Sequence, residues 1–301
     1  MLLLTGATGL VGSTLLGRLL AEGTPVRCLV RDPRRLGAQR VRVQIALGDL
    51  TDPPSFRNAL RGVETVVHLA ASIRDQPRGS IEELCGIATW RMVEAAQRQG
   101  VERFVFFSAL GASNHHRTRC LRAKALAEQA VREADLHSIV FAPSIVYAPR
   151  DPWLTLLERL ALLPVMPVSG NGRALYQPIW AEDVAECVIA ALRAQATGVP
   201  GSPGDARHAR YELAGPETLS HTDIVRTVLR SLHRRRLLMH LPTPLVSRSL
   251  RLLETIAGPR AFATWDEAEL MEVAMTSARD TADAEALGVH PQRMAAVLGS
   301  G

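Results

Sequence analysis

Hydrophobic and polar residues follow two different patterns along the first half of the chain. Short apolar runs are separated by longer segments in which apolar residues recur every three or four positions. The short runs are typical of buried strands, and the longer segments are typical of amphipathic helices. The predicted strands are Leu2–Leu4, Val26–Val30, Val41–Ala46, Thr65–Leu69, Phe104–Ser108 and Ser138–Ala142. The helices predicted between them are Ser13–Glu22, Pro54–Leu60, Ile81–Gln99 and Arg119–Glu133.

The alternation of strand and helix indicates βαβ units, in which the strands pair in parallel. Six strands with crossover helices predict an α/β fold built on a doubly wound parallel sheet of the Rossmann type. In such a sheet the ligand binds in a crevice at the carboxyl ends of the strands. We therefore expect the functional residues to lie directly after the strands.

The pattern becomes less regular after residue 148. The elements predicted there are helices at Trp153–Leu163 and Ala181–Arg193, a loop at Gly198–Asp205, a strand at Tyr211–Ala214, a helix capped by Ser220 and Asp223 that runs through Ser231, and a mostly helical tail from Arg234 to Gly301. We divide the chain into a nucleotide-binding domain at 1–148 and a smaller, mostly helical substrate or capping domain at 149–301. The boundary is soft, because chain crossings between the two parts are expected.

A glycine-rich turn joins the first predicted strand to the first predicted helix, at Thr5–Gly12. Its glycines permit a tight turn and a close approach of the backbone to a pyrophosphate. The start of the helix adds N–H donors and the positive end of the helix dipole. The turn therefore predicts a dinucleotide site. The cofactor-contacting residues expected in it are Gly6, Thr8, Gly9, Leu10 and Val11.

The residues after the second predicted strand bear on which dinucleotide binds. An acidic residue about 20 positions beyond the turn would hold the ribose 2′-hydroxyl of NAD, whereas an arginine accommodates the 2′-phosphate of NADP. Arg31 ends this strand, Asp32 follows it, and Arg34 and Arg35 add positive charge. Arg31 in the phosphate-facing place favours NADP(H). NAD is the alternative, with Asp32 on the ribose and Arg31 in water.

Composition and charge exclude several other classes of protein. The 301 residues are 47% hydrophobic and 22% charged, as in a globular chain. No apolar run reaches the ~18 residues of a transmembrane helix, and no basic leader precedes the first strand, so we expect a cytoplasmic protein. The net charge is +5, and the basic tract at Arg234–Arg236 is short. Both observations argue against nucleic-acid binding, which needs many phosphate contacts. The four cysteines lie far apart, so neither a metal site nor a disulfide framework is expected.

Lysine is almost absent from the chain. Of the 35 basic residues, Lys124 is the single lysine and the other 34 are arginine. A codon bias would replace lysine wherever a guanidinium serves equally well, so the survivor indicates a place that needs an ammonium. Chance is the alternative explanation.

Several motifs together resemble the extended and atypical short-chain dehydrogenases/reductases. The resemblance covers most of the chain. The segments that carry it are Thr5–Gly12, Gly48–Leu50, His68–Ala71, Ser108, Pro143–Tyr147 and Gln177–Ala185. The stretches Ser108–Ala112 and Leu121–Ala125 are similar to the branch of the NADPH-binding accessory subunit of respiratory complex I. Beyond the glycine turn, the resemblance implies cofactor contacts at Asp49, Leu50, Leu69, Ala70, Ala71, Lys124, Pro143 and Ile145.

The resemblance also implies a catalytic arrangement, from which this chain departs. The family keeps a serine at the place of Ser108, and a Tyr-x-x-x-Lys pair on the following helix moves the proton and binds the nicotinamide ribose. Lys124 takes the place of the lysine, but Cys120 takes that of the tyrosine. Cys85 takes the place of an asparagine that the family often keeps on the preceding helix. The catalytic candidates are therefore Ser108, Lys124 and Cys120.

Cys120 is a poor replacement for tyrosine as a proton donor. Its sulfur lies one bond beyond Cβ, whereas proton transfer needs roughly 2.6–3.2 Å between heavy atoms. A neighbouring ammonium also favours the thiolate, which is a better nucleophile than acid. Other candidates for the acid are His115, His116, Tyr147 or a bound water. Cys85 and Cys120 could also face each other as a redox-sensing pair.

The C-terminal part offers two further interpretations. The segment His233–Gly258 is either a helix packed on the second domain, which is favoured, or a basic amphipathic surface that lies on an anionic membrane. Another set of apolar residues either lines a cavity for an apolar substrate or belongs to a core: Trp153, Leu157, Met166, Tyr176 and Trp180.

Two functions agree with these observations. In the first, an NAD(P)(H)-dependent oxidoreductase or epimerase-like enzyme acts on an unknown, apolar carbonyl or alcohol substrate. In the second, a catalytically lapsed NADPH binder serves as a structural subunit or redox sensor, in association with a protein complex or a membrane surface. The glycine turn, Arg31 and Lys124 support both, and Cys120 in place of tyrosine favours the second. Their common ground is an NAD(P)-binding oxidoreductase-like protein.

Overall fold

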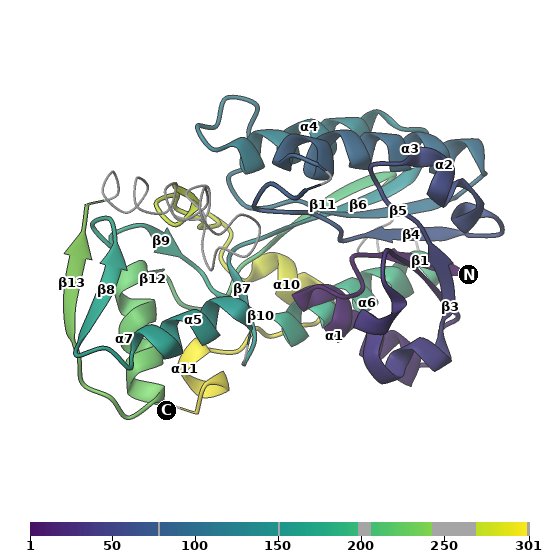
Figure 1. The fold of residues 1–301 in the computed structure, drawn as a ribbon. Coiled ribbons are helices and arrows are strands. Elements are labelled where there is room, and N and C mark those ends of the chain that lie inside the picture. The colour runs from purple at the N-terminus through teal and green to yellow at the C-terminus, as the bar shows by residue number, and fades with distance from the viewer. Residues whose placement is uncertain (78, 150, 198–205, 243–268, 300–301) are drawn as a thin grey trace.

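A parallel sheet with helices on both faces forms the larger part of the molecule, and a smaller lobe lies at one end of it (Figure 1). The computed structural model describes residues 1–77, 79–149, 151–197, 206–242 and 269–299. The predicted doubly wound α/β fold is confirmed. The strands of the large sheet are β1 Leu2–Thr5, β2 Val26–Val30, β3 Gln44–Leu47, β4 Thr65–His68, β5 Arg103–Phe107, β6 His137–Pro143 and β11 His208–Leu213.

The spatial order of these strands is β11-β6-β5-β4-β1-β2-β3, and neighbouring strands are parallel throughout. The chain leaves β1 in one direction and returns through β4 on its other side. The order of strands therefore reverses between β1 and β4, and the crevice of a doubly wound sheet opens at such a reversal. This places the glycine turn after β1 and the segment after β4 side by side.

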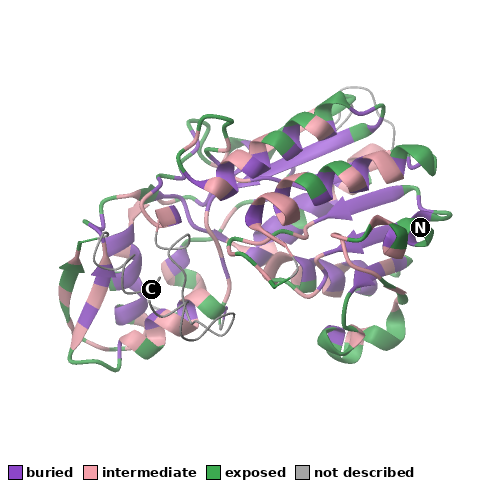
Figure 2. Ribbon diagram, turned by 45° about the horizontal axis from the view of Figure 1, so that its top comes forward, coloured by how far each residue is buried: buried purple, intermediate pink, exposed green. Residues whose placement is uncertain are grey.

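Two apolar layers hold the helices against the sheet. Alternate strand residues such as Leu4 and Val105 pack toward one face, while Leu3 and Phe104 pack toward the other. Helices α1 Leu10–Ala21 and α6 Ala181–Thr197 cover the first face; α2 Pro53–Phe56, the 3-10 helix η2 Arg57–Leu60, α3 Ala88–Arg98 and α4 Arg119–Glu133 cover the second. Figure 2 shows the strands buried between helices whose outer sides are exposed.

The smaller lobe has an apolar core of its own. Its elements are α5 Pro152–Leu160, β8 Val165–Ser169, β9 Leu175–Tyr176, β12 Leu219–Ser220, α7 His221–Ser231, β13 Leu237–Leu241 and α11 Met294–Val297. Two short parallel strands, β7 Val146–Tyr147 and β10 Ile179–Trp180, connect it to the sheet. The apolar residues suggested as a cavity lining lie in or against this core. The predicted cap of α7 is present, because Ser220 and Asp223 form a capping box.

The chain passes between the two parts more than once. Helix α6 and strand β11 follow residue 148 in the sequence but belong to the sheet and its layers, and α10 Ala282–Ala286 packs against β11. The sheet is therefore completed by residues from both sides of the predicted boundary.

Three predicted elements differ from the structure. The predicted strand Val41–Ala46 corresponds to β3, which begins later, at Gln44. The reason is that the 3-10 helix η1 Pro33–Arg42 includes the first residues of the predicted strand. The predicted helix Ile81–Gln99 begins with a π-helix, η3 Glu83–Ile87. The tail predicted to be mostly helical contains strand β13, which pairs in parallel with β8. The predicted loop Gly198–Asp205 and the part of the tail at 243–268 lie outside the described residues. No helix of the described chain is long and apolar enough to span a bilayer.

Candidate functional site

The glycine turn after β1 brings three backbone segments into close contact. Gly6 has a φ of +72°, and a Cβ on it would lie 2.7 Å from the backbone nitrogen of Ala70. A Cβ on Gly12 would lie 2.1 Å from the carbonyl oxygen of Gly6. The Gly9 N–H donates to that same oxygen at 2.9 Å. A side chain is therefore excluded at Gly6 and at Gly12 by sterics, and the backbone segments pack closely there.

The start of α1 offers open N–H donors. Gly9 is exposed and is the N-cap residue, with no side-chain cap and no acidic residue in the first turn. The first N–H groups of a helix have no intrahelical partner, and together with the helix dipole they attract an anion. Thr8 is half-buried in the turn, and Leu10 and Val11 begin the helix. These predicted residues thus share one edge of the sheet, and their contacts with a cofactor stay predictions.

A buried histidine fixes the segment after β4. The ring of His68 meets Thr5 Oγ1 at 2.9 Å through Nδ1 and Thr89 Oγ1 at 3.2 Å through Nε2. Burial, and to a lesser extent the charge of Lys124, lowers the pKa of His68 to about 3, so the ring is neutral. Thr5 Oγ1 also accepts the Ala70 N–H at 3.4 Å. This network, which the sequence did not indicate, holds the predicted residues Leu69, Ala70 and Ala71 beside the glycine turn.

Arg31 and Asp32, which follow β2, have different environments. The Asp32 carboxylate accepts the Arg34 N–H at 2.9 Å and caps η1. Arg31, Arg34 and Arg35 are exposed, and their side chains form no ion pair within the described part of the chain. The Asp32 carboxylate therefore serves as a helix cap, while the three arginines of this short segment are exposed.

The residues after β3 lie next to the end of β2. The Gly48 N–H donates to the Val30 carbonyl at 3.2 Å, which aligns the two segments. Asp49 is half-buried, and its Oδ1 accepts hydrogen bonds from the backbone N–H and the hydroxyl of Thr51 at 3.1 and 2.9 Å. Leu50 packs against the core on the α3 face. The two predicted residues Asp49 and Leu50 are thus held rigidly at the same edge.

Ser108 and Lys124 meet at the end of β5. Ser108 follows the strand, is 3% exposed, and its Oγ has no hydrogen-bond partner among the described residues. The Lys124 ammonium, reaching over from α4, donates to the carbonyl of Phe107 at 2.5 Å and lies 5.5 Å from the centre of the Phe106 ring. The Lys124 ammonium therefore binds the peptide carbonyl directly before Ser108, and the catalytic and cofactor roles of the two residues stay predictions.

Cys120 and Cys85 form a small buried cluster with Ile81 and Ala123. The side chain of Cys120, supported by the charge of Lys124, lowers the pKa of Cys85 despite its burial. The cysteine that replaces the family tyrosine thus lies beside another cysteine.

The other candidate acids have different environments. His115 is exposed on the loop before α4. His116 Nδ1 accepts the Thr118 N–H at 3.1 Å, and a positively charged neighbourhood together with burial lowers the His116 pKa, so this ring supports the start of the helix. Tyr147 is fully buried in the core of the smaller lobe, its hydroxyl has no partner among the described residues, and burial raises its pKa.

The segment after β6 connects the sheet with the smaller lobe. The Pro143 carbonyl accepts the Leu110 N–H at 2.9 Å, and the Ile145 carbonyl accepts the Ile179 N–H at 3.0 Å. Ser144 Oγ donates to the Met275 carbonyl at 2.7 Å. The predicted residues Pro143 and Ile145 therefore sit at the junction of both parts, next to the loop that follows Ser108.

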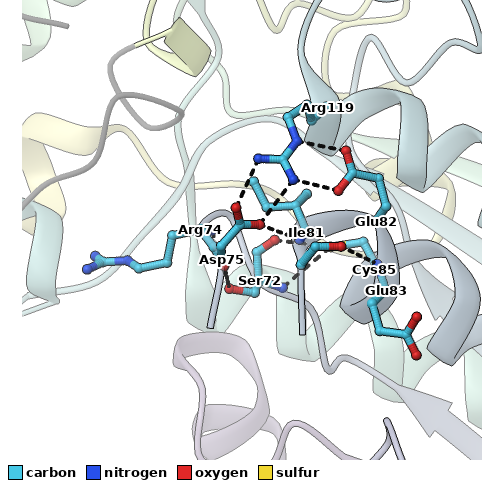
Figure 3. Close-up of polar contacts among 9 residues, drawn as sticks. Ser72, Arg74, Asp75, Ile81, Glu82, Glu83, Cys85 and Arg119 are labelled. Carbon is cyan, nitrogen blue, oxygen red and sulfur yellow. Dashed lines mark hydrogen bonds and ion pairs between the residues drawn. The ribbon is translucent and has the colours of Figure 1, made fainter. Parts of the chain in front are cut away.

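An ion-pair network closes one side of this region, and the sequence gave no sign of it because its members are far apart along the chain. Arg119, the first residue of α4, binds both carboxylate oxygens of Glu82 at 2.7 Å and those of Asp75 at 3.1 and 3.2 Å (Figure 3). Asp75 Oδ1 also accepts the Ile81 N–H at 2.8 Å. The hydrogen bond from Arg119 lowers the pKa of Glu82 to about 2. We call residues 72–77 and 79–82 the strap, which this network fastens to α4.

Taken together, these groups fit a dinucleotide. The turn provides closely packed backbone at its glycines, α1 provides open N–H donors, and the segment after β2 provides exposed arginines. Ser108 and Lys124 provide a hydroxyl and an ammonium at the far side of the reversal point. A metal has no comparable place, since no cluster of three His, Cys, Asp or Glu side chains suited to an ion occurs in the described residues.

Comparison with known proteins agrees with this geometry. The model of a family described as NAD(P)H-binding matches residues 6–195, which is more than half of the chain. Over 268 residues the chain is 26% identical to the mitochondrial NADH dehydrogenase (ubiquinone) 1 alpha subcomplex subunit 9 of Arabidopsis thaliana, an alignment that covers 85% of the chain and 62% of that protein. Over 198 residues it is 30% identical to the ceramide reductase of Caulobacter vibrioides, covering 65% of the chain and 62% of the relative.

A solved structure shows the same fold over the whole chain. A nucleoside-diphosphate-sugar epimerase from Staphylococcus aureus superposes with a TM-score of 0.74 at 17% identity, covering 99% of both chains. The two sequence relatives are longer than the matched region, because the chain spans 62% of the length of each. The chain belongs to an NAD(P)H-binding family, as the motifs predicted. A subunit of the complex to which the predicted branch belongs is among the proteins similar to it.

The contact between Gly12 and Gly6 can be tested by paired substitutions within α1. We expect Gly12→Ala to lower the free energy of unfolding by about 1–3 kcal/mol, because its Cβ has no room against the backbone. Gly17→Ala is the matched control: its Cβ would lie 3.3 Å from the flexible Gln39 side chain, so the usual helix gain of about 0.5–1 kcal/mol should roughly offset that contact. Denaturant unfolding of both variants checks this, and equal stabilities would contradict the close contact.

Proposed function

Because the chain belongs to the NAD(P)H-binding family of short-chain dehydrogenase/reductase type, we propose that it binds NADP(H) in preference to NAD(H) and is an oxidoreductase for an apolar carbonyl or alcohol. The observation that carries the catalytic part of the proposal is the buried, unpartnered Ser108 hydroxyl beside Lys124. The observation that carries the cofactor part is the arrangement at the end of β2.

The NADP(H) preference rests on how Asp32 and Arg31 differ. Asp32 uses its carboxylate to cap η1, which leaves it less suited to a ribose diol. Arg31, Arg34 and Arg35 are exposed on the same short segment. A guanidinium binds a phosphate through charge-assisted hydrogen bonds that are stronger than neutral ones. The 2′-phosphate of NADP(H) would meet this charge, and NAD(H) carries no such group.

The chemistry rests on the groups after β5. When bound, NADPH supplies a hydride for the carbonyl carbon of a substrate. The Ser108 hydroxyl donates a hydrogen bond to the substrate oxygen, since it has no other partner within the described chain. Lys124, held by the Phe107 carbonyl, keeps two further N–H donors for the ribose and adds positive charge near the developing alkoxide. The neutral His68 adds no competing charge beside it.

The apolar substrate class is supported by the surroundings and by a relative. The partly buried apolar side chains of Ile145, Trp153 and Trp180 pack against the core of the smaller lobe, near the segment after β6. One relative is named ceramide reductase, which is an enzyme for a lipid. We propose a lipid-like carbonyl as the substrate class.

A second function is favoured by one specific observation. Cys120 stands where the family has its tyrosine, and its side chain lowers the pKa of the neighbouring Cys85 thiol. A chain without a proton donor would hold NADPH without turnover. Another relative is named as a subunit of NADH dehydrogenase, which supports a role in a protein complex. In this alternative the chain is an NADPH-binding subunit or sensor.

The cofactor preference is tested by fluorescence titration of NADPH and NADH. We expect Arg31→Gln to weaken NADPH binding about ten- to hundredfold, the loss of one charge-assisted hydrogen bond of about 1.5–3 kcal/mol, with little effect on NADH. Arg40→Gln is the control, because Arg40 is equally exposed on η1 but lies away from the end of β2. Equal affinity of the wild type for both nucleotides would overturn the preference.

The place of the single lysine is tested by Lys124→Arg. Lys124 is 8% exposed between the Phe107 carbonyl and the Phe106 ring, so a wider guanidinium has little space there. We expect NADPH binding to weaken about tenfold or more, since the ribose loses a hydrogen bond to a charged donor. Arg122→Lys, on the same helix but bonded to the loop carbonyls of His116 and Arg117, is the control and should bind normally.

Catalysis is tested by following NADPH oxidation with long-chain aldehydes and ketones. We expect wild-type turnover, and a decrease in kcat of about a hundredfold in Ser108→Ala, because one donor to the developing oxyanion is lost. Cys120→Tyr is assayed in parallel. Turnover that appears only in Cys120→Tyr would reject the enzyme in favour of the NADPH-binding subunit, and NADPH affinity measured on the same samples separates that result from a failure to bind.

A further inference from the structure

Two of the four cysteines lie against each other beside the proposed cofactor lysine. Cys85 comes from the π-helix η3 and Cys120 from the first turn of α4, and they are 2% and 7% exposed. Gly86 makes this contact possible, because a Cβ there would be in ordinary contact with Ala123 at 3.5 Å and larger side chains would push the helices apart. A π-helical turn is a feature that often occurs at functional sites.

The surroundings of Cys85 lower the pKa of its thiol. Its sulfur accepts the Ser72 N–H at 3.4 Å and donates to the Ser72 carbonyl at 3.1 Å. The side chain of Cys120 and the charge of Lys124 both lower the pKa of Cys85, while burial and Glu82 raise it. Loss of the Cys85 proton would place a counter-charge near the ammonium of Lys124, with which no carboxylate pairs within the described part of the chain.

The other two cysteines have no such surroundings. Cys28 lies in β2 and Cys187 in α6, both within the core on the α1 face. Burial raises the pKa of each to about 12, which keeps them as thiols. The chain thus contains one reactive pair and two internal controls.

We propose that Cys85 and Cys120 are a redox modification site, at which hydrogen peroxide produces a reversible disulfide. This goes beyond the proposed function, since it needs neither the dinucleotide nor a substrate. The Cys85 thiolate attacks one peroxide oxygen, the O–O bond breaks, and a sulfenic acid and hydroxide form. The Cys120 sulfur then attacks the sulfenic sulfur; the S–S bond forms, the S–O bond breaks, and the thiol proton leaves with the oxygen as water. The two sulfurs are oxidised by two electrons, and peroxide is reduced.

The strap lies against this pair. Ser72, its first residue, contacts the Cys85 sulfur through its N–H and its carbonyl, at 3.4 and 3.1 Å. Asp75 and Glu82 fasten the strap to Arg119, the residue before Cys120 (Figure 3). These carboxylates are about half exposed, so solvent and ions reach the network.

Oxidation would change the charge beside Lys124. The disulfide carries no thiolate, so the ammonium would lose a negative group that interacts with it. The redox state of the two sulfurs is in this way coupled to the residue proposed to hold the nicotinamide ribose.

The test uses the full-length wild-type protein, without nucleotide, treated with hydrogen peroxide and then with an alkylating agent. Trypsin cleavage after Arg78, Arg91, Arg119 and Arg122 places Cys85 in the peptide 79–91 and Cys120 in the peptide 120–122. We expect mass spectrometry to find these two peptides linked, with the loss of two hydrogen atoms. Dithiothreitol should release both peptides in alkylatable form.

The controls come from the same digest. The peptides that contain Cys28 and Cys187 should stay fully alkylatable, and Cys120→Ser should stop at the sulfenic acid of Cys85, which a dimedone probe detects. Recovery of both peptides as alkylated thiols after peroxide would overturn the proposal. So would a disulfide that involves Cys28 or Cys187, or over-oxidation of Cys85 in the wild type without any linked peptide. None of these results depends on whether NADPH binds.

Discussion

The contact between the glycine turn and the segment after β4 is the constraint on which the rest of the site depends. The backbone of Gly6 lies against that of Ala70, and Gly12 lies against Gly6, with no space for a Cβ at either glycine. Because β1 and β4 are neighbours at the reversal of the strand order, this contact brings the start of α1 to the crevice. The network of His68 with Thr5 and Thr89 holds the opposing segment in register with the turn.

A second constraint is the burial of one ammonium group. Lys124 lies at the end of β5 with a carbonyl, an aromatic ring and a neutral histidine around it. A cation that is removed from water needs hydrogen bonds and a negative partner. The Phe107 carbonyl supplies the first, and loss of the proton from Cys85, whose pKa the Lys124 charge helps to lower, would supply the second. The properties of lysine, sulfur and histidine in this region therefore depend on one another.

The same two constraints connect the alternative functions. An oxidoreductase needs a polarised oxygen site, and the unpartnered Ser108 hydroxyl provides one. A sensor needs a group that changes state beside the cofactor, and the pair of Cys85 and Cys120 provides that. Replacement of the family tyrosine by Cys120 is therefore the point at which the two functions diverge, because the same thiol weakens proton transfer and creates a redox pair.

The sequence by itself determined the sheet, the glycine turn and the position of the single lysine. These follow from local signals: the period of apolar residues, the spacing of glycines, and a residue type that occurs once in the chain. It placed the first strand well, but the next helix begins at Leu10 and not at the predicted Ser13, and strand β13, which pairs with β8, was missed. Local sequence carries little information about such pairing, since strand stability depends on the neighbouring strand.

Only the tertiary structure decided how distant groups meet. Asp75, Glu82 and Arg119 form one network although 44 residues separate the first from the last. The cap that engages Asp32 and the contact between the two cysteines are likewise products of the folded arrangement. Charge and hydrogen bonding act over a few ångströms, so their effect is fixed only when the chain has brought the partners within that distance.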